Sequence, residues 1–90
     1  FIEATDDRMK NKKNVKQVTI GKNIVTVGEG AFYNCSNLRK IIVKSLQLKQ
    51  VKKNVLKKTN KKLLIKLPKK KSRSYQKLFK KKGNTKVSFK

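Results

Sequence analysis

Short apolar-x-apolar segments, in which two apolar residues flank a third residue of any kind, recur along this chain at a nearly constant spacing. Such alternation predicts half-buried strands whose apolar side chains point to one side. Three segments share it, 23 and then 24 residues apart: Val18-Thr19-Ile20, Ile41-Ile42-Val43 and Ile65-Lys66-Leu67. A period near this length predicts stacked units, because each unit leaves an apolar edge that only its neighbour covers. We therefore expect a repeat solenoid with parallel strands at residues 18–20, 41–43 and 65–67, and an antiparallel hairpin would contradict it.

Further apolar positions recur between these strands. The recurring pairs, 24 residues apart, are Ile24 with Leu48, Val27 with Val51, Ala31 with Val55 and Phe32 with Leu56. Gly21 and Asn23 turn the chain after the first strand, and Val25-Thr26-Val27 predicts a second short strand. Gly28-Glu29-Gly30 then permits a tight path into a compact helical or 3₁₀ turn. Each unit thus contains a strand, a turn, a second strand and a helical turn.

The predicted units divide the chain into four parts. Residues 1–17 are the back part of an earlier unit, 18–40 form the clearest unit, 41–64 form a degenerate unit, and 65–90 hold a final strand, a helix and a tail. The first part is matched to the second at a spacing of 23 residues: Ala4 to Val27, Met9 to Phe32 and Val15 to Leu38. The chain thus begins within a unit and starts with Phe1, so we expect the C-terminal piece of a longer protein.

The last part departs from the repeat. Pro68 lacks the N–H that a strand ladder needs and ends the strand. Ser72 or Ser74 can cap a helix through residues 75–82, and Gly83-Asn84 is a suitable stop.

An apolar stripe on the predicted helix supports a capping role. Tyr75, Leu78 and Phe79 share one face, and lysines occupy the other. We expect this helix to close the last apolar surface of the solenoid and to end the recurrence, with Val87-Ser88-Phe89 as a final short strand.

The charge of the chain is strongly positive, +23. All four acids, Glu3, Asp6, Asp7 and Glu29, lie in the first third, and the adjacent Asp6-Asp7 pair is expected in a solvated loop. Residues 41–90 carry 19 Lys or Arg and no acid. This field attracts anionic partners, whether nucleic acid, acidic glycans, anionic cell surfaces or acidic proteins.

Few residues suit catalysis or metal binding. With no His, only four acids and one Cys, the chain predicts no catalytic site, no cofactor and no zinc site. Gly28-Glu29-Gly30 lacks the Lys-Ser/Thr of a phosphate loop. Cys35, spaced three residues from Phe32 and from Leu38, is expected in the core. The longest apolar runs have three residues, too few for a membrane span.

The outer face of the predicted strands is one candidate binding surface. With the repeating apolar residues inward, Thr19, Ile42 and Lys66 point outward, flanked by Lys40, Lys44 and Leu64. One interpretation is a basic surface for an acidic protein or a polyanionic surface. The other is that these lysines keep an exposed sheet soluble and block edge pairing.

A second candidate is the basic run Pro68–Arg73, with Lys69, Lys70, Lys71 and Arg73 as anion-binding residues. Short basic clusters serve nuclear import or nucleic-acid binding. The alternative hypothesis is therefore a small basic nucleic-acid-binding or nuclear protein acting through its lysine-rich half. Against it, Tyr33 and Tyr75 are the main aromatic residues for base stacking, and Tyr75 is expected in the core. Nonspecific nucleic-acid binding at low salt is expected in either case.

One run of residues carries a family resemblance. Val27–Ile41, Val-Gly-Glu-Gly-Ala-Phe-Tyr-Asn-Cys-Ser-Asn-Leu-Arg-Lys-Ile, resembles the BspA-type leucine-rich repeat, whose pattern is roughly I-G-x-x-A-F-x-x-C-x-x-L-x-x-I. The next unit departs from it, with Lys52–Leu56 at the Gly and Ala-Phe positions and Thr59 at the Cys position. Pro68–Lys71, followed by Tyr75, Leu78 and Gly83, looks like the basic C-terminal cap of many such proteins.

The resemblance implies a non-enzymatic binding scaffold. Members of the family act in adhesion, binding host extracellular proteins or other cells, and this implies a secreted or cell-surface bacterial protein. The terminal units present here either bind a partner or only cap the array. Neither the ligand nor the oligomeric state follows from the sequence.

Overall fold

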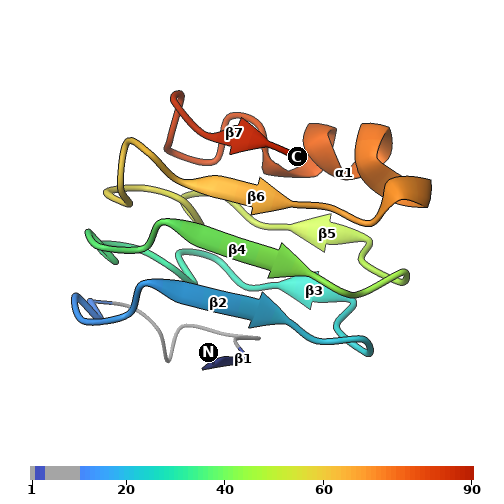
Figure 1. Cartoon of the computed structure of the whole chain (residues 1–90), viewed down its shortest axis with the longest axis horizontal. Helices are drawn as coiled ribbons and strands as arrows, with labels where there is room; N and C mark the ends of the chain where they lie inside the picture. The colour runs from blue at the N-terminus through green and yellow to red at the C-terminus, as the bar shows by residue number, and fades with distance from the viewer. Residues whose placement is uncertain (1, 4–10) are drawn as a thin grey trace.

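A computed structural model of the chain describes residues 2–3 and 11–90. Its strands are parallel and stack side by side (Figure 1). The larger sheet has the order β1-β2-β4-β6-β7 and the smaller sheet has the order β3-β5. The strands are β1 (Ile2–Glu3), β2 (Gln17–Ile20), β3 (Thr26–Val27), β4 (Lys40–Val43), β5 (Gln50–Val51), β6 (Leu64–Lys66) and β7 (Ser88–Phe89).

The register of the larger sheet follows the recurrence in the sequence. Val18 lies beside Ile41, and Ile41 lies beside Ile65. Ile20 lies beside Val43 in the same way. The expected repeat solenoid is therefore confirmed, with parallel strands at all three predicted places.

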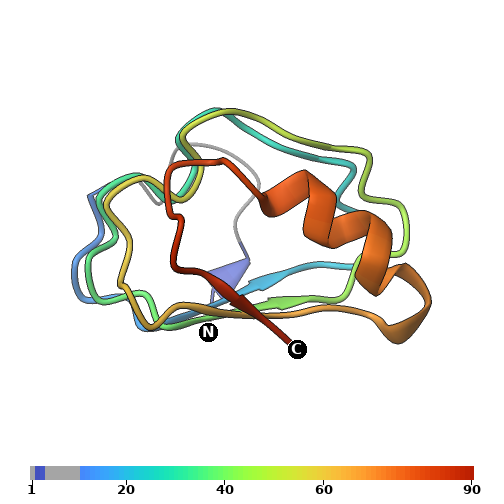
Figure 2. The ribbon, with the colours of Figure 1, turned by 90° about the horizontal axis from the view of Figure 1, so that it is seen from above.

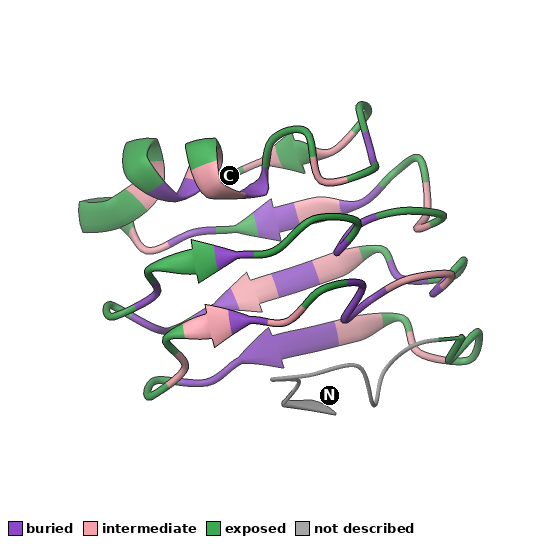
Figure 3. Cartoon of the chain, turned by 180° about the vertical axis from the view of Figure 1, so that it is seen from behind, coloured by how far each residue is buried: buried purple, intermediate pink, exposed green. Residues whose placement is uncertain are grey.

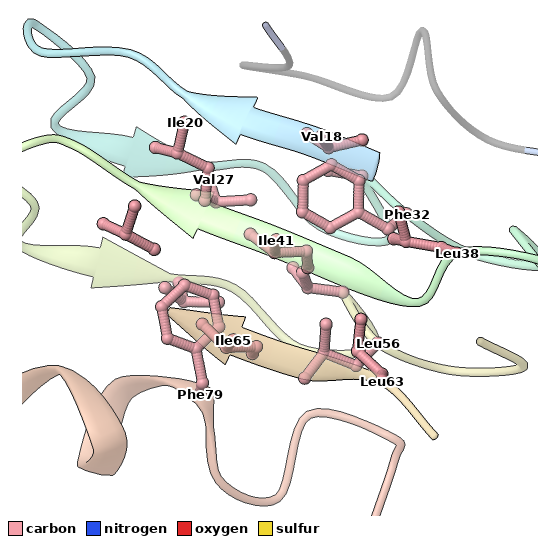
Figure 4. Close-up of a cluster of buried hydrophobic side chains, with 14 of the residues drawn as sticks. Val18, Ile20, Val27, Phe32, Leu38, Ile41, Leu56, Leu63, Ile65 and Phe79 are labelled. Carbon is pink, nitrogen blue, oxygen red and sulfur yellow. The ribbon is translucent and has the colours of Figure 1, made fainter. Parts of the chain in front are cut away.

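The core lies between the two columns of strands, which form opposite walls of the solenoid in Figure 2. Apolar residues from every complete coil fill it, as expected from the recurring positions (Figure 4). Fully buried members include Val18, Ile20, Val27, Phe32, Leu38, Ile41, Leu56, Leu63, Ile65 and Phe79. Because side chains from neighbouring coils meet here, each coil depends on the next for its burial.

The segments after the smaller sheet are tight turns, not helices. Successive bonds span three residues: Ala31 N–H donates to Gly28 O at 3.2 Å, and Cys35 N–H donates to Phe32 O at 3.1 Å. The next coil repeats this pattern, with Thr59 N–H donating to Leu56 O at 3.3 Å. Coils are tied to each other as well, since Phe32 N–H donates to Val55 O at 3.2 Å.

The helix begins and ends earlier than predicted. A 3₁₀ turn, η2 (Lys69–Lys71), leads directly into α1 (Ser72–Phe79), so the predicted range 75–82 is wrong at both ends. Neither predicted serine caps it, because the N-cap is Lys71 without a side-chain bond. The 3₁₀ turn supplies carbonyl partners for the first N–H groups, and Ser72 N–H donates to Lys69 O. No side-chain cap is therefore needed.

The helix covers only part of the last coil. It contacts β5, where a third strand of the smaller sheet would stack, and buries Tyr75 and Phe79 (Figures 1 and 2). The recurrence was expected to end at the helix, but it continues beyond it. Leu56 N–H donates to Lys82 O at 2.8 Å, and β7 pairs with β6 in parallel. Lys82 lies outside the helix, and its backbone carbonyl is bound by the preceding coil instead.

The predicted strand at Val87-Ser88-Phe89 is confirmed as β7, Ser88–Phe89. Gly83, predicted as a helix stop, instead has a φ of 108° in the turn that follows. The proposed equivalences of Ala4 and Met9, and the loop expected at Asp6-Asp7, lie outside the described residues.

Candidate binding surface on the larger sheet

Strand alternation places two rows of side chains on the outer face of the larger sheet. Lys40 lies between Gln17 and Leu64 in one row, and Ile42 lies between Thr19 and Lys66 in the next. Neighbouring strands are about 4.8 Å apart and rows about 7 Å apart. The β4 and β6 strands thereby bring Lys40 and Lys66 onto one surface.

Exposure along these rows increases toward the C-terminus. Lys66 and Lys44 are exposed, while Lys40 and Ile42 are half-buried. Thr19, which was predicted to point outward, is only 3% exposed and so adds little to the accessible surface. Thr19 does alternate with the buried Val18 and Ile20, but a short side chain beside the bulkier Ile42 is shaded from solvent. The accessible part of this face is therefore centred on β4 and β6.

None of the outer-face lysines, Lys40, Lys44 and Lys66, has an acid on an adjacent strand among the described residues. Glu3 of β1 stands in the row of Lys66, but Thr19 and Ile42 lie between them. The row neighbours are Gln17, Leu64, Ser88, Thr19 and Ile42. Lys44 directly follows β4, and its N–H donates to Ile20 O at 2.9 Å, which fixes its backbone against β2. Glu29, the one acid in residues 11–90, lies in the turn after β3. Their charges are thus left for a partner to neutralise.

The second predicted group lies elsewhere. Lys69, Lys70 and Lys71 form η2, and Arg73 lies in the first turn of α1. All four are exposed (Figure 3). η2 lies in the connection that leads from β6 toward the smaller sheet, not on the outer sheet face (Figure 2). The structure therefore separates the predicted site residues into two groups.

The buried Cys35 does not form part of either group. Its position in the core is confirmed, and its Sγ donates to Tyr33 O at 3.9 Å. Burial away from water raises the pKa of its thiol, and a backbone hydrogen bond at Lys12 opposes this only partly. A thiol held in its protonated form is a poor nucleophile. In the described part of the chain, no cluster of three metal-binding side chains is found.

Sequence analysis missed a column of asparagines that holds the coils in register. Asn37, Asn60 and Asn84 form this asparagine ladder, in which each side-chain N–H₂ donates to a backbone carbonyl of the preceding coil. The bonds join Asn37 to Lys13 O at 2.7 Å, Asn60 to Ser36 O at 3.2 Å and Asn84 to Asn60 O at 3.0 Å. The signal was present, since these asparagines recur after 23 and 24 residues.

The family model described as the BspA type leucine-rich repeat region (6 copies) matches residues 5–90. Comparison with curated proteins and with solved structures finds no match. The family provides repeat modules for protein interaction, is typically non-enzymatic and is associated with surface or secreted bacterial proteins. Among the described helices, none has the length and apolar character needed to cross a membrane. From its matched repeats and its stacked parallel coils, the chain belongs to the BspA-type leucine-rich repeat family.

Proposed function

We propose that this chain is a binding module of a bacterial surface or secreted protein, and that it mediates adhesion by holding an acidic segment of a partner protein. The outer face of the larger sheet is the proposed site. The observation that carries this is the set of outer-face lysines, which share one surface with no acid on an adjacent described strand.

The sheet gives this surface a fixed geometry. Lys40 and Lys66 lie in successive rows on neighbouring strands, and their backbones are locked by the ladder between β4 and β6. An acidic chain lying across the strands can therefore place carboxylates near both ammonium groups without reordering the backbone. An exposed ion pair between a lysine ammonium and a carboxylate contributes about 0.2–1 kcal/mol to the binding free energy. Specificity therefore depends on several such pairs acting together.

Binding to an acidic peptide tests the proposal. The variant Lys40→Gln/Lys44→Gln/Lys66→Gln removes three charges from the outer face. The control, Lys49→Gln/Lys52→Gln/Lys53→Gln, removes three exposed charges around β5 on the opposite wall. With poly-glutamate at physiological ionic strength, we expect the outer-face variant to bind about tenfold more weakly and the control to lose little. Equal losses would mean that only the total charge matters.

The alternative, nucleic-acid binding through the group in η2 and α1, has one observation in its favour. Lys69, Lys70, Lys71 and Arg73 are all exposed on consecutive turns. The aromatic groups do not support base stacking, because Tyr75 is 3% exposed and Lys58 Nζ lies 5.6 Å from the centre of the Tyr33 ring. Duplex DNA binding should therefore fall steeply as salt rises, and tight sequence-dependent binding near physiological salt would favour the alternative.

A further inference from the structure

Two successive turns gather lysines along one edge of the solenoid, away from the outer sheet face. The lysine edge consists of Lys57, Lys58, Lys81 and Lys82. Leu56 N–H donates to Lys82 O at 2.8 Å, which stacks the two turns directly. At Gly83, an added Cβ would lie 2.7 Å from Lys57 Cα, so the backbones are in close contact. These turns follow each other along the left side of Figure 1.

Two of these lysines occupy a backbone conformation that disfavours them. Lys58 has a φ of 61° and Lys81 a φ of 60°, in the left-handed region. Earlier coils have asparagine in the same conformation: Asn34, 24 residues before Lys58, has a φ of 60°, and Asn54, in the coil before Lys81, has a φ of 61°. Asparagine tolerates this region better than lysine. In the last two coils, the less suitable residue therefore replaces the more suitable one.

The replacement also removes a bond between coils. Asn34 Nδ2 donates to Asn11 Oδ1 at 2.9 Å, a contact that lysine cannot reproduce. In its place, the two adjacent turns carry several like charges, and the one acid among residues 11–90 is Glu29, which lines a hollow with Tyr33, the ring that Lys58 covers. Both backbone strain and charge repulsion oppose folding, and strained residues of this kind concentrate at functional sites.

A hollow beside the lysine edge suggests what the lysines bind. It has a volume of about 290 Å³ and is lined by Lys80, Lys81, Asn84, Thr85, Val87 and Phe89. Its wall thus combines ammonium groups, an exposed hydroxyl at Thr85 and the half-buried ring of Phe89. A sugar ring has the same mixed character, with hydroxyls at its rim and C–H groups on its faces.

We propose that the lysine edge and this hollow bind a linear sulfated polysaccharide. Sulfate groups along the chain would lie against Lys57, Lys58, Lys81 and Lys82, and one sugar ring would occupy the hollow. An acidic peptide fits less well, because its carboxylate side chains have no flat C–H face to lie against the half-buried ring of Phe89. Nucleic acid fits less well too, because Lys58 covers the Tyr33 ring that a base would need.

Binding to heparin, compared with poly-glutamate and duplex DNA at physiological salt, tests the proposal. The variant Lys58→Asn/Lys81→Asn restores the residue of the preceding coils, so its fold should be retained. Its charge-matched control is Lys49→Gln/Lys52→Gln, at exposed sites that flank β5. We expect heparin to bind most tightly, the asparagine variant to bind it about tenfold or more weakly, and the control to stay within about twofold.

Three results would overturn the proposal. Equal losses of heparin affinity in the Lys58→Asn/Lys81→Asn variant and in its Lys49→Gln/Lys52→Gln control would mean that heparin is attracted only by the total charge. An unchanged affinity of the Lys58→Asn/Lys81→Asn variant would exclude the lysine edge. Tighter binding of poly-glutamate or DNA than of heparin would assign the edge to a different ligand class. The Lys40→Gln/Lys44→Gln/Lys66→Gln variant should retain heparin binding, which separates this site from the outer sheet face.

Discussion

Replacing Tyr75 with Phe tests how the last coil is closed. The Tyr75 hydroxyl joins α1 to the turn before β5, since it donates to Ser45 O at 3.0 Å and accepts from Leu48 N–H at 3.1 Å. The side chain is 3% exposed, so water does not readily replace it. The Tyr75→Phe variant keeps the ring and its packing but leaves one backbone donor and one acceptor without this partner.

The loss of stability follows from the two backbone groups that lose their partner, Leu48 N–H and Ser45 O. Leaving a buried polar group unpaired costs about 1–3 kcal/mol, so for these two groups the free energy of unfolding should fall by about 2–6 kcal/mol. For a domain of this size, a loss of 1 kcal/mol lowers Tm by about 4–8 °C, so a drop of at least about 8 °C is expected.

Urea and thermal unfolding, followed by circular dichroism, measure this loss. Tyr33→Phe is the matched control, because Tyr33 is half-buried and its ring faces Lys58, and a change below about 0.5 kcal/mol is expected. A loss for Tyr75→Phe no larger than that of Tyr33→Phe would refute the assigned role of the hydroxyl.

Three further substitutions probe the turns and the core. Lys58→Asn should raise the free energy of unfolding by about 1 kcal/mol in urea titrations, because it relieves left-handed strain at φ 61° and permits a bond to Asn34; no gain would mean the strain is negligible. Gly83→Ala should lower it by about 2–3 kcal/mol, since φ is 108° and the new Cβ would clash with Lys57; a neutral effect would contradict the close approach. Because burial raises the pKa of Cys35, the wild type should lose stability as pH rises above about 8.5, and Cys35→Ala should lose less; parallel pH profiles would contradict this.

The strand positions were predictable because their signal is repeated. Val18, Ile41 and Ile65 recur as buried apolar residues at spacings of 23 and 24, and burial on one face of a sheet permits only one register. The helix was predicted less well. The stripe of Tyr75, Leu78 and Phe79 indicates which face is buried. The helix ends at Phe79, just before Lys82 bonds to the preceding coil, and this bond is a tertiary effect.

The candidate binding surface was predicted only in part. Alternation correctly places Lys40 and Lys66 on one face. It does not predict how far neighbouring side chains cover a residue on that face, so the burial of Thr19 beside Ile42 was missed. The asparagine ladder was missed because asparagine is common in turns for local reasons, and its bonds here reach the preceding coil. The lysine edge depends on backbone angles at Lys58 and Lys81, which no local pattern reveals.

The most direct test of the proposed function is a titration of the ¹⁵N-labelled chain with poly-glutamate, followed residue by residue in NMR spectra at physiological salt. We predict that chemical-shift changes concentrate at Lys40, Ile42, Lys44 and Lys66, on the accessible part of the larger sheet. Changes of equal size at Lys49, Lys52 and Lys53, or changes confined to η2, would contradict the claim that the outer sheet face is the site for an acidic protein.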